Sequence, residues 1–335
     1  MGLLNRRSDK QPKSPIEQPR LDRLDPFLAD GDLRSAYRAL VDGDWPSLEA
    51  FLANNPKAWM FRPIVTGDVV GLEPVAFERW VEFQNSPQSR VFLASALLRD
   101  AYASSADIAA SNVGVATESE EEHFHQQLNI VEEILFEVVQ ARPAMADPWV
   151  VLLASGRGLG VELEELRKRF ESAHSRESFR PDACHEYLQS LTKKWRGSNV
   201  ATMDLAHWIE AESSPDSPAR AVLPLAHIEK GVLEEGKDGL FGYLAKREVA
   251  DELTEGVSNF LAAIPSDTPT EALDVLNAYA LALNINDRVT ARLMTDVLAR
   301  IDNRPTNSPW SLLGEDIKGV FSEVQADQLR LAGRH

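Results

Sequence analysis

The chain has 335 residues, a formal net charge of −17 and one cysteine, and 44% of its residues are hydrophobic. This length suits two domains of roughly 100 to 200 residues or one continuous helical array. The acidic balance argues against nucleic acid and anionic membranes as partners, because phosphates are bound by clustered Lys and Arg. No run approaches the roughly 18 to 20 apolar residues of a membrane span, so we expect no membrane association.

The use of cysteine points to a cellular compartment. A lone cysteine, Cys184, excludes an intrachain disulfide framework and is typical of a reducing environment. The first residues also lack the apolar core of a signal peptide, so we expect a cytoplasmic protein. Cys184 shares a helical stripe with Tyr187, Leu188 and Leu191, which predicts a buried, unreactive thiol.

The start of the chain differs in charge from the rest. Residues 1–20 hold five basic side chains against two acidic ones, together with three prolines and few apolar residues. This composition predicts a disordered basic tail over residues 1–24. An arm that docks on an acidic surface is the alternative interpretation.

An N-terminal helical region is predicted over residues 25–118. Apolar residues recur at helical spacing from Leu33 to Leu40. Asp44 is the expected cap of a second helix, with Pro46 in its first turn. The two helices form a hairpin.

Two stretches of this region lack a helical period. Residues 59–71 predict a short extended connection, with a strand as the alternative. Residues 104–118 contain small and polar side chains and predict a long loop, a candidate seam between domains.

The rest of the chain, residues 119–335, predicts a second helical domain. Ser119 and Glu122 have the spacing of a capping box. The apolar stripe of the helix that follows consists of Phe124, Leu128, Val131, Leu135 and Val138.

Further helix starts are predicted where a capping residue precedes a proline. The residue pairs are Ser86-Pro87, Asp147-Pro148, Ser217-Pro218, Thr268-Pro269 (with Glu271 completing a capping box) and Ser308-Pro309. The glycines of residues 156–160 are expected to end the helix that begins at Asp147.

A repeat also emerges, because Arg142-Pro143 recurs 38 residues later as Arg180-Pro181. One helix pair per roughly 34 to 47 residues is the period of tetratricopeptide and HEAT-type arrays.

The stretch from Asp147 to Met203 carries a resemblance. Its features are Trp149, the pair Phe170 and Ala173, Pro181, and the turn Trp195-Arg196-Gly197-Ser198. Over residues 140–235 the chain resembles the tetratricopeptide-like helical domain of an uncharacterised family of bacterial proteins. The resemblance implies protein–protein contacts and supplies no catalytic residues.

One polar cluster is a candidate contact site. Lys193, Lys194 and Arg196 surround Trp195 just before a helix predicted to begin near Asn199. Helix N-termini attract anions, so an anion or an acidic side chain of a partner is a candidate ligand. The alternative is that Trp195 packs on the helices while the three cations face solvent.

Catalytic and metal sites are not predicted. Glu121 and His125 have the spacing of two metal ligands, but acidic residues in a first helical turn are favoured by the helix dipole alone. His174, His207 and His227 occur singly and are expected at the surface or between helices. We therefore predict no metal, no cofactor and no catalytic residue.

These patterns predict an all-α protein of stacked helical hairpins, either a tetratricopeptide-like α-solenoid or an irregular helical array. The functional hypothesis is a scaffold that binds a peptide or a partner domain, basic or amphipathic in character, in a helical groove. The alternative is a helical enzyme or small-ligand-binding protein with a polar site between helices.

Overall fold

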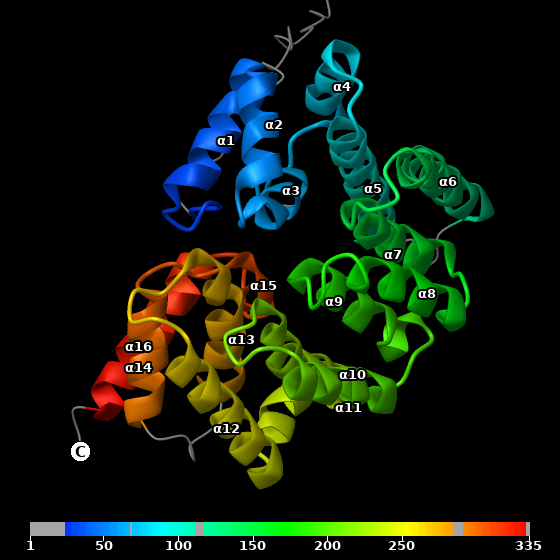
Figure 1. The fold of residues 1–335 in the computed structure, drawn as a ribbon. Coiled ribbons are helices and arrows are strands. Elements are labelled where there is room, and N and C mark those ends of the chain that lie inside the picture. Colours follow the sequence, from blue (N-terminus) through cyan, green and yellow to red (C-terminus); the bar gives the residue numbers. More distant parts are fainter. Residues whose placement is uncertain (1–23, 68, 111–116, 285–290, 333–335) are drawn as a thin grey trace, which may run out of the picture.

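The computed structural model describes residues 24–67, 69–110, 117–284 and 291–332 (Figure 1). Every regular element in these ranges is a helix, so the all-α prediction is confirmed. None of these helices is long and apolar enough to cross a membrane. The predicted tail of residues 1–24 lies outside the described residues, apart from Leu24.

The helices pack against one another in an array. The α-helices are α1 (Gly31–Asp42), α2 (Trp45–Asn54), α3 (Ala58–Thr66), α4 (Pro74–Phe83), α5 (Pro87–Ala110), α6 (Glu118–Ala141), α7 (Asp147–Leu159), α8 (Leu163–His174), α9 (Pro181–Ser190), α10 (Asn199–Glu212), α11 (Val222–Leu244), α12 (Arg247–Ala263), α13 (Leu273–Asn284), α14 (Ala291–Ile301), α15 (Asn307–Trp310) and α16 (Ile317–Ala332). Short 3-10 helices are η1 (Lys193–Trp195), η2 (Pro218–Ala221) and η3 (Thr270–Ala272).

The stretch without a helical period is a helix after all. Residues 58–66 form α3, so neither the extended connection nor the strand occurs there. Phe61 packs against Phe51 and Phe92 at ring distances of 5.7 and 5.9 Å. The apolar pattern lapses because Arg62 and Thr66 are polar and yet buried, Arg62 in contact with α9.

Helix boundaries were predicted unevenly. The carboxylate of Asp44 and the hydroxyls of Ser86 and Ser217 accept backbone hydrogen bonds, so these three caps are confirmed. The other predicted caps were wrong. The capping box is formed by Thr117 and Glu120, η3 has no side-chain cap, and α15 begins before Ser308. Helix α7 does begin at Asp147, as predicted, but Asp147 is its first residue and does not cap it.

Two glycine and loop predictions also have clear outcomes. Helix α7 ends at Gly160, which adopts a left-handed conformation with φ of 66°, while the earlier glycines of this stretch remain helical. Helix α5 continues to Ala110, so the predicted loop is wrong for residues 104–110. Residues 111–116 of that loop lie outside the described residues.

Four main apolar cores follow the chain, one for each group of neighbouring helices. The predicted boundary near residue 118 falls between α5 and α6, although Val91 of α5 shares a core with Val131 and Leu135 of α6. Cys184 is fully buried beside Leu188, and burial raises the pKa of its thiol, so the prediction of a buried thiol is confirmed.

The first helices contact the segment that begins α13. Leu273 at the start of α13 packs into the core of α1 to α5. Asp30 ahead of α1 receives hydrogen bonds from Lys57 at 2.6 Å and from Thr270 at 2.8 Å. Figure 1 shows α1 to α3 facing α13 and α15, with α9 beside them. The array therefore closes on itself, and this closure positions the site described next.

A candidate ligand-binding cavity

A cavity of about 470 Å³ lies where three distant parts of the chain meet. Its walls come from residues 24–28 and α3, from the first two turns of α9, and from η2, α11, α13 and residues 305–309. Binding sites for small organic groups typically measure about 300 to 1,000 Å³. The cavity is therefore large enough for a small molecule or for side chains of a bound peptide.

Most of the wall is apolar. Trp59 and Ile64 contribute from α3, and Val222 and Leu225 contribute from α11. The remaining apolar lining includes prolines from several elements, namely Pro26, Pro63, Pro181, Pro218, Pro305 and Pro309. Rigid apolar walls favour the burial of an apolar stem or ring.

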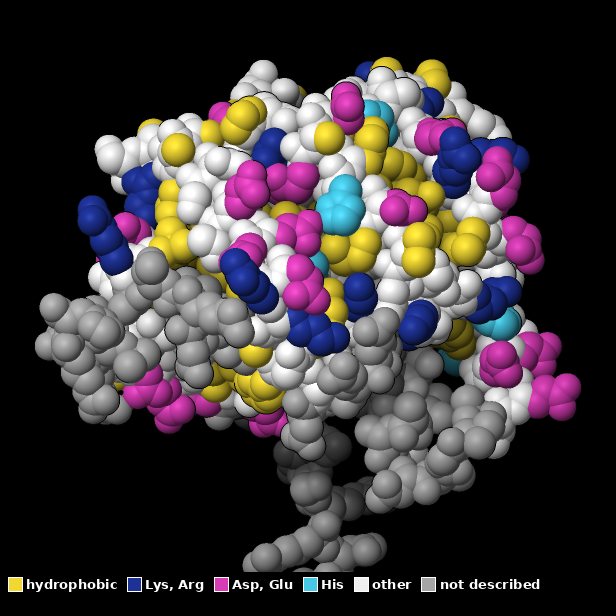
Figure 2. Space-filling view, turned by 90° about the horizontal axis from the view of Figure 1, so that it is seen from below, with side chains coloured by type: hydrophobic (Ala, Val, Ile, Leu, Met, Phe, Trp, Pro, Cys, Tyr) yellow, Lys and Arg dark blue, Asp and Glu magenta, His cyan; other side chains and the backbone are white. Residues whose placement is uncertain are grey.

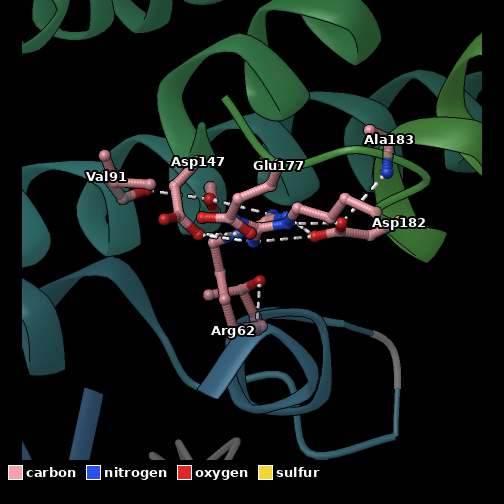
Figure 3. Close-up of polar contacts among 9 residues, drawn as sticks. Arg62, Val91, Asp147, Glu177, Asp182 and Ala183 are labelled. Atoms are coloured by element: carbon pink, nitrogen blue, oxygen red, sulfur yellow. Dashed lines mark hydrogen bonds and ion pairs between the residues drawn. The ribbon is translucent and has the colours of Figure 1, made fainter. Parts of the chain in front are cut away.

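The α9 wall is built on a buried network of ion pairs (Figure 3). Asp182 binds Arg180 at 2.8 Å and Arg62 at 2.7 Å, and Arg180 also binds Asp147 at 2.6 Å. The side chains of Arg180, Arg62 and Asp182 are only 3%, 9% and 10% exposed. The network joins α3, α7 and α9.

Electrostatics hold this network in its charged form. Burial by itself would raise the pKa of Asp182, but Arg180 and Arg62 outweigh it and keep that pKa below its usual value. Burial also opposes the charge of Arg180, yet Asp182 and Asp147 raise its pKa well above the usual range. The charges of this wall are therefore matched within the protein.

Two further residues of α9 reach the cavity. Glu186 forms an ion pair with Arg157 at 2.7 Å. Burial would raise the pKa of Glu186, but Arg157 overcomes it and lowers that pKa. Burial lowers the pKa of His185, which favours the neutral imidazole at pH 7. The carboxylate of Asp25, on the opposite side, pairs with Arg34 at 2.5 Å.

The α13 wall differs. Of the residues Leu273 to Leu283, only Asp274 is exposed, and it lines the cavity. Within the described residues, Asp274 has no hydrogen-bond or ion-pair partner. Asp274 is accessible from the cavity, but the protein around its carboxylate limits hydration of the charged form, and this desolvation raises the pKa of Asp274 to about 6.

Asn277, one turn after Asp274, fixes the neighbouring wall. Its side-chain oxygen accepts a hydrogen bond from the Trp310 indole at 2.7 Å, and its amide donates to the Arg304 carbonyl at 3.2 Å. These contacts hold residues 305–309 against α13. Asn277 is fully buried, so the hydrogen bonds are shielded from water.

The predicted contact residues lie elsewhere. Lys194 pairs with Glu229 at 3.1 Å, and Arg196 donates a hydrogen bond to the carbonyl of Gly160. The ring of Trp195 lies 6.3 Å from the ring of Tyr102. The guanidinium of Arg157 lies 5.5 Å from the centre of the Trp195 ring. Lys193 is exposed on η1. None of the four residues lines the cavity, and an anion or partner contact there stays a prediction.

A second polar cluster joins α10, α11 and α12. Nδ1 of the buried His227 lies 2.9 Å from the Tyr243 hydroxyl, and its Nε2 lies 3.1 Å from Glu252. His207 contacts the other oxygen of Glu252 at 2.7 Å. The hydrogen bond from His227 lowers the pKa of Glu252. This cluster connects three helices.

The described residues contain no metal-binding group, and one face of the molecule mixes charges of both signs. In the described part of the chain, no three His, Cys, Asp or Glu side chains are placed to hold a metal ion. On the face seen from below, acidic and basic side chains are interspersed with hydrophobic ones (Figure 2).

Sequence reasoning missed the cavity. Its walls are up to 285 residues apart in the chain, from Leu24 to Pro309, so no local pattern reports it. One local signal was present, since Asp274 is the only charged residue of the largely apolar α13 segment LDVLNAYALALN. An acidic residue in a largely apolar helix indicates a position that faces solvent or a cavity, and Asp274 faces this cavity.

Comparisons with known proteins add no relative. No protein-family model, no curated protein and no solved structure matches the chain.

Proposed function

We propose that the protein is a binding protein that holds a segment of a partner polypeptide in this cavity, without turnover. The cavity between α3, α9 and α13 carries the proposal, because three distant parts of the chain combine to leave one apolar space. The matched charges of Asp182 and Glu186 support it, since groups held in ion pairs suit a rigid wall better than proton transfer.

The chemistry of the partner follows from charge. A protein of net charge −17 attracts a basic or amphipathic segment, and association weakens as salt screens the attraction. A cytoplasmic location belongs to the same proposal and rests on the lone cysteine. The tetratricopeptide-like resemblance of residues 140–235 points to the same class of function.

A small-ligand-binding protein or enzyme is the second candidate. Asp274 favours it, because a carboxyl group with a pKa of about 6 lies in the range used for general acid–base catalysis. His185 lines the same cavity. A turnover reaction that depends on Asp274 or His185 would replace the binding proposal.

The test is a peptide array probed with the full chain and two matched variants. Ile64→Trp places an indole into the cavity from α3, whereas Val200→Trp adds the same ring at a residue of α10 that is 70% exposed. We expect a set of basic peptides to bind the wild type and Val200→Trp and to be lost from Ile64→Trp. Equal binding by all three proteins would contradict the cavity as the site.

A further inference from the structure

We propose that Asp274 is the counter-ion for a primary ammonium group on an aliphatic stem, such as a lysine side chain of the partner. The inference rests on the proposed function and names the group that the cavity receives. It follows from the difference between Asp274 and every other charged residue that lines the cavity.

The other carboxylates already have cations. Asp25 is paired with Arg34, Asp182 with Arg62 and Arg180, and Glu186 with Arg157. Because these pairs are formed within the protein, they offer a ligand little net attraction. The cavity therefore presents one unmatched negative charge, among the described residues, at a defined point of its wall.

The position of Asp274 keeps that charge available. The residue lies in the first turn of α13, where the helix dipole favours a carboxylate. With a pKa of about 6, the carboxyl group is mostly ionised at pH 7.5. A carboxylate that protein partly surrounds and no cation pairs with is less stable in its charged form, and an arriving cation stabilises that form.

The neighbouring wall adds polar side chains to the same cavity. Thr306, Asn307 and Ser308 line the cavity on the segment that Asn277 and Trp310 hold against α13. An ammonium has three donors, and this segment supplies oxygen acceptors beyond the carboxylate. A guanidinium also pairs well with a carboxylate, so the preference for an ammonium on an aliphatic stem comes from the apolar walls.

The apolar walls match the rest of the group. Trp59, Ile64, Val222 and Leu225 face the same space as Asp274. A lysine side chain buries its methylene stem on apolar surface and presents its charge at the end. An anionic ligand would meet the charge of Asp274 with the same sign.

The probe is n-hexylammonium, compared with 1-hexanol, which keeps the stem and lacks the charge. Calorimetric titrations at pH 7.5 use the full chain, Asp274→Asn, and the control Asp204→Asn at an exposed position of α10. We expect Asp274→Asn to weaken n-hexylammonium binding about tenfold, as for a lost charge-assisted hydrogen bond. Binding of 1-hexanol should be unchanged, and Asp204→Asn should match the wild type for both probes.

Failure of this inference differs from failure of the proposed function. If Asp274→Asn binds n-hexylammonium as well as the wild type while Ile64→Trp excludes both probes, the cavity binds ligands but Asp274 is not the counter-ion. If the wild type binds n-hexylammonium only after the basic residues of positions 1–23 are changed to glutamine, the chain's own arm is the occupant. That result would contradict the proposal that the cavity binds an ammonium group of another molecule.

Discussion

The two walls of the cavity differ in whether their carboxylates are paired with cations. On the α9 wall, Asp182 is held by two arginines, so its folded-state pKa is depressed. On the α13 wall, Asp274 has no partner within the described residues, and its pKa is raised to about 6. Both residues lie against the same space. The protein surrounds both carboxylates, although the side chain of Asp182 is only 10% exposed and Asp274 is accessible from the cavity. The arginines that the fold supplies to Asp182 alone account for the opposite directions of the two pKa shifts.

The two pKa shifts have opposite consequences for the stability of the fold. A carboxylate with a depressed pKa stabilises the fold above its unfolded pKa, and this contribution is lost as the pH falls. A carboxylate with a raised pKa destabilises the fold as the pH rises through its folded-state pKa, because the folded state binds the proton more tightly than the unfolded state. The α9 wall thus contributes stability at neutral pH, whereas Asp274 reduces it, as expected of a residue kept for a ligand.

The largest effect is expected from breaking the α9 network. Arg180→Met leaves Asp147 and Asp182 buried with less compensation, since the Arg180 side chain is only 3% exposed. Removal of one member of a buried ion pair typically costs about 3 to 5 kcal/mol. We expect a loss of this size in urea denaturation.

The control is Arg167→Met, which removes an exposed pair with Glu171 along α8. Its unfolding midpoint should stay close to that of the wild type. Equal midpoints for the two variants would show that the α9 network does not stabilise the fold.

A smaller loss is expected from Arg62→Met. Asp182 keeps Arg180 in this variant, so the change removes one short hydrogen bond to a charged group, together with the longer contacts of Arg62 with Ser95 at 3.5 Å and Asp147 at 4.0 Å. Hydrogen bonds to charged groups contribute about 1.5 to 3 kcal/mol. The same denaturation assay should place Arg62→Met between the wild type and Arg180→Met. A loss larger than that of Arg180→Met would reverse this ranking.

The smallest effect has the opposite sign, and it is small because Asp274 is exposed to solvent, which screens its charge. Asp274 has a pKa of about 6 in the folded protein against an ordinary value of 3.8, so its ionisation removes stability as the pH rises through this range. Asp274→Asn stays neutral. We expect its melting temperature to exceed that of the wild type at pH 8 and to match it at pH 4. Destabilisation at pH 8 would mean that the carboxylate has a structural role.

The sequence predicted local features well. The stripe from Leu33 to Leu40 and the cap at Asp44 depend on residues within one or two turns, and both are present. Helix α3 was missed because its buried Arg62 is stabilised by Asp182, 120 residues away. A polar residue at a core position breaks the apolar period, and only the tertiary partner explains it.

The cavity escaped prediction for the same reason. It exists because α13 returns to the first helices, through Leu273 in their core and the hydrogen bond from Thr270 to Asp30. These contacts span 240 residues. The helical period of each segment indicates which face is buried, but it does not report which distant helix covers that face.

The titration of the Asp274 carboxyl group tests the account most directly. Carbon-13 NMR of protein labelled at aspartate would follow it, and its absence from Asp274→Asn identifies the signal. The other ionisable groups of the cavity wall are Asp25, Asp182, His185 and Glu186. We predict a midpoint of about 6 that falls when n-hexylammonium binds, because a nearby cation favours the ionised form. A midpoint at or below about 3.9, unchanged by the amine, would contradict the unmatched charge on which the account depends.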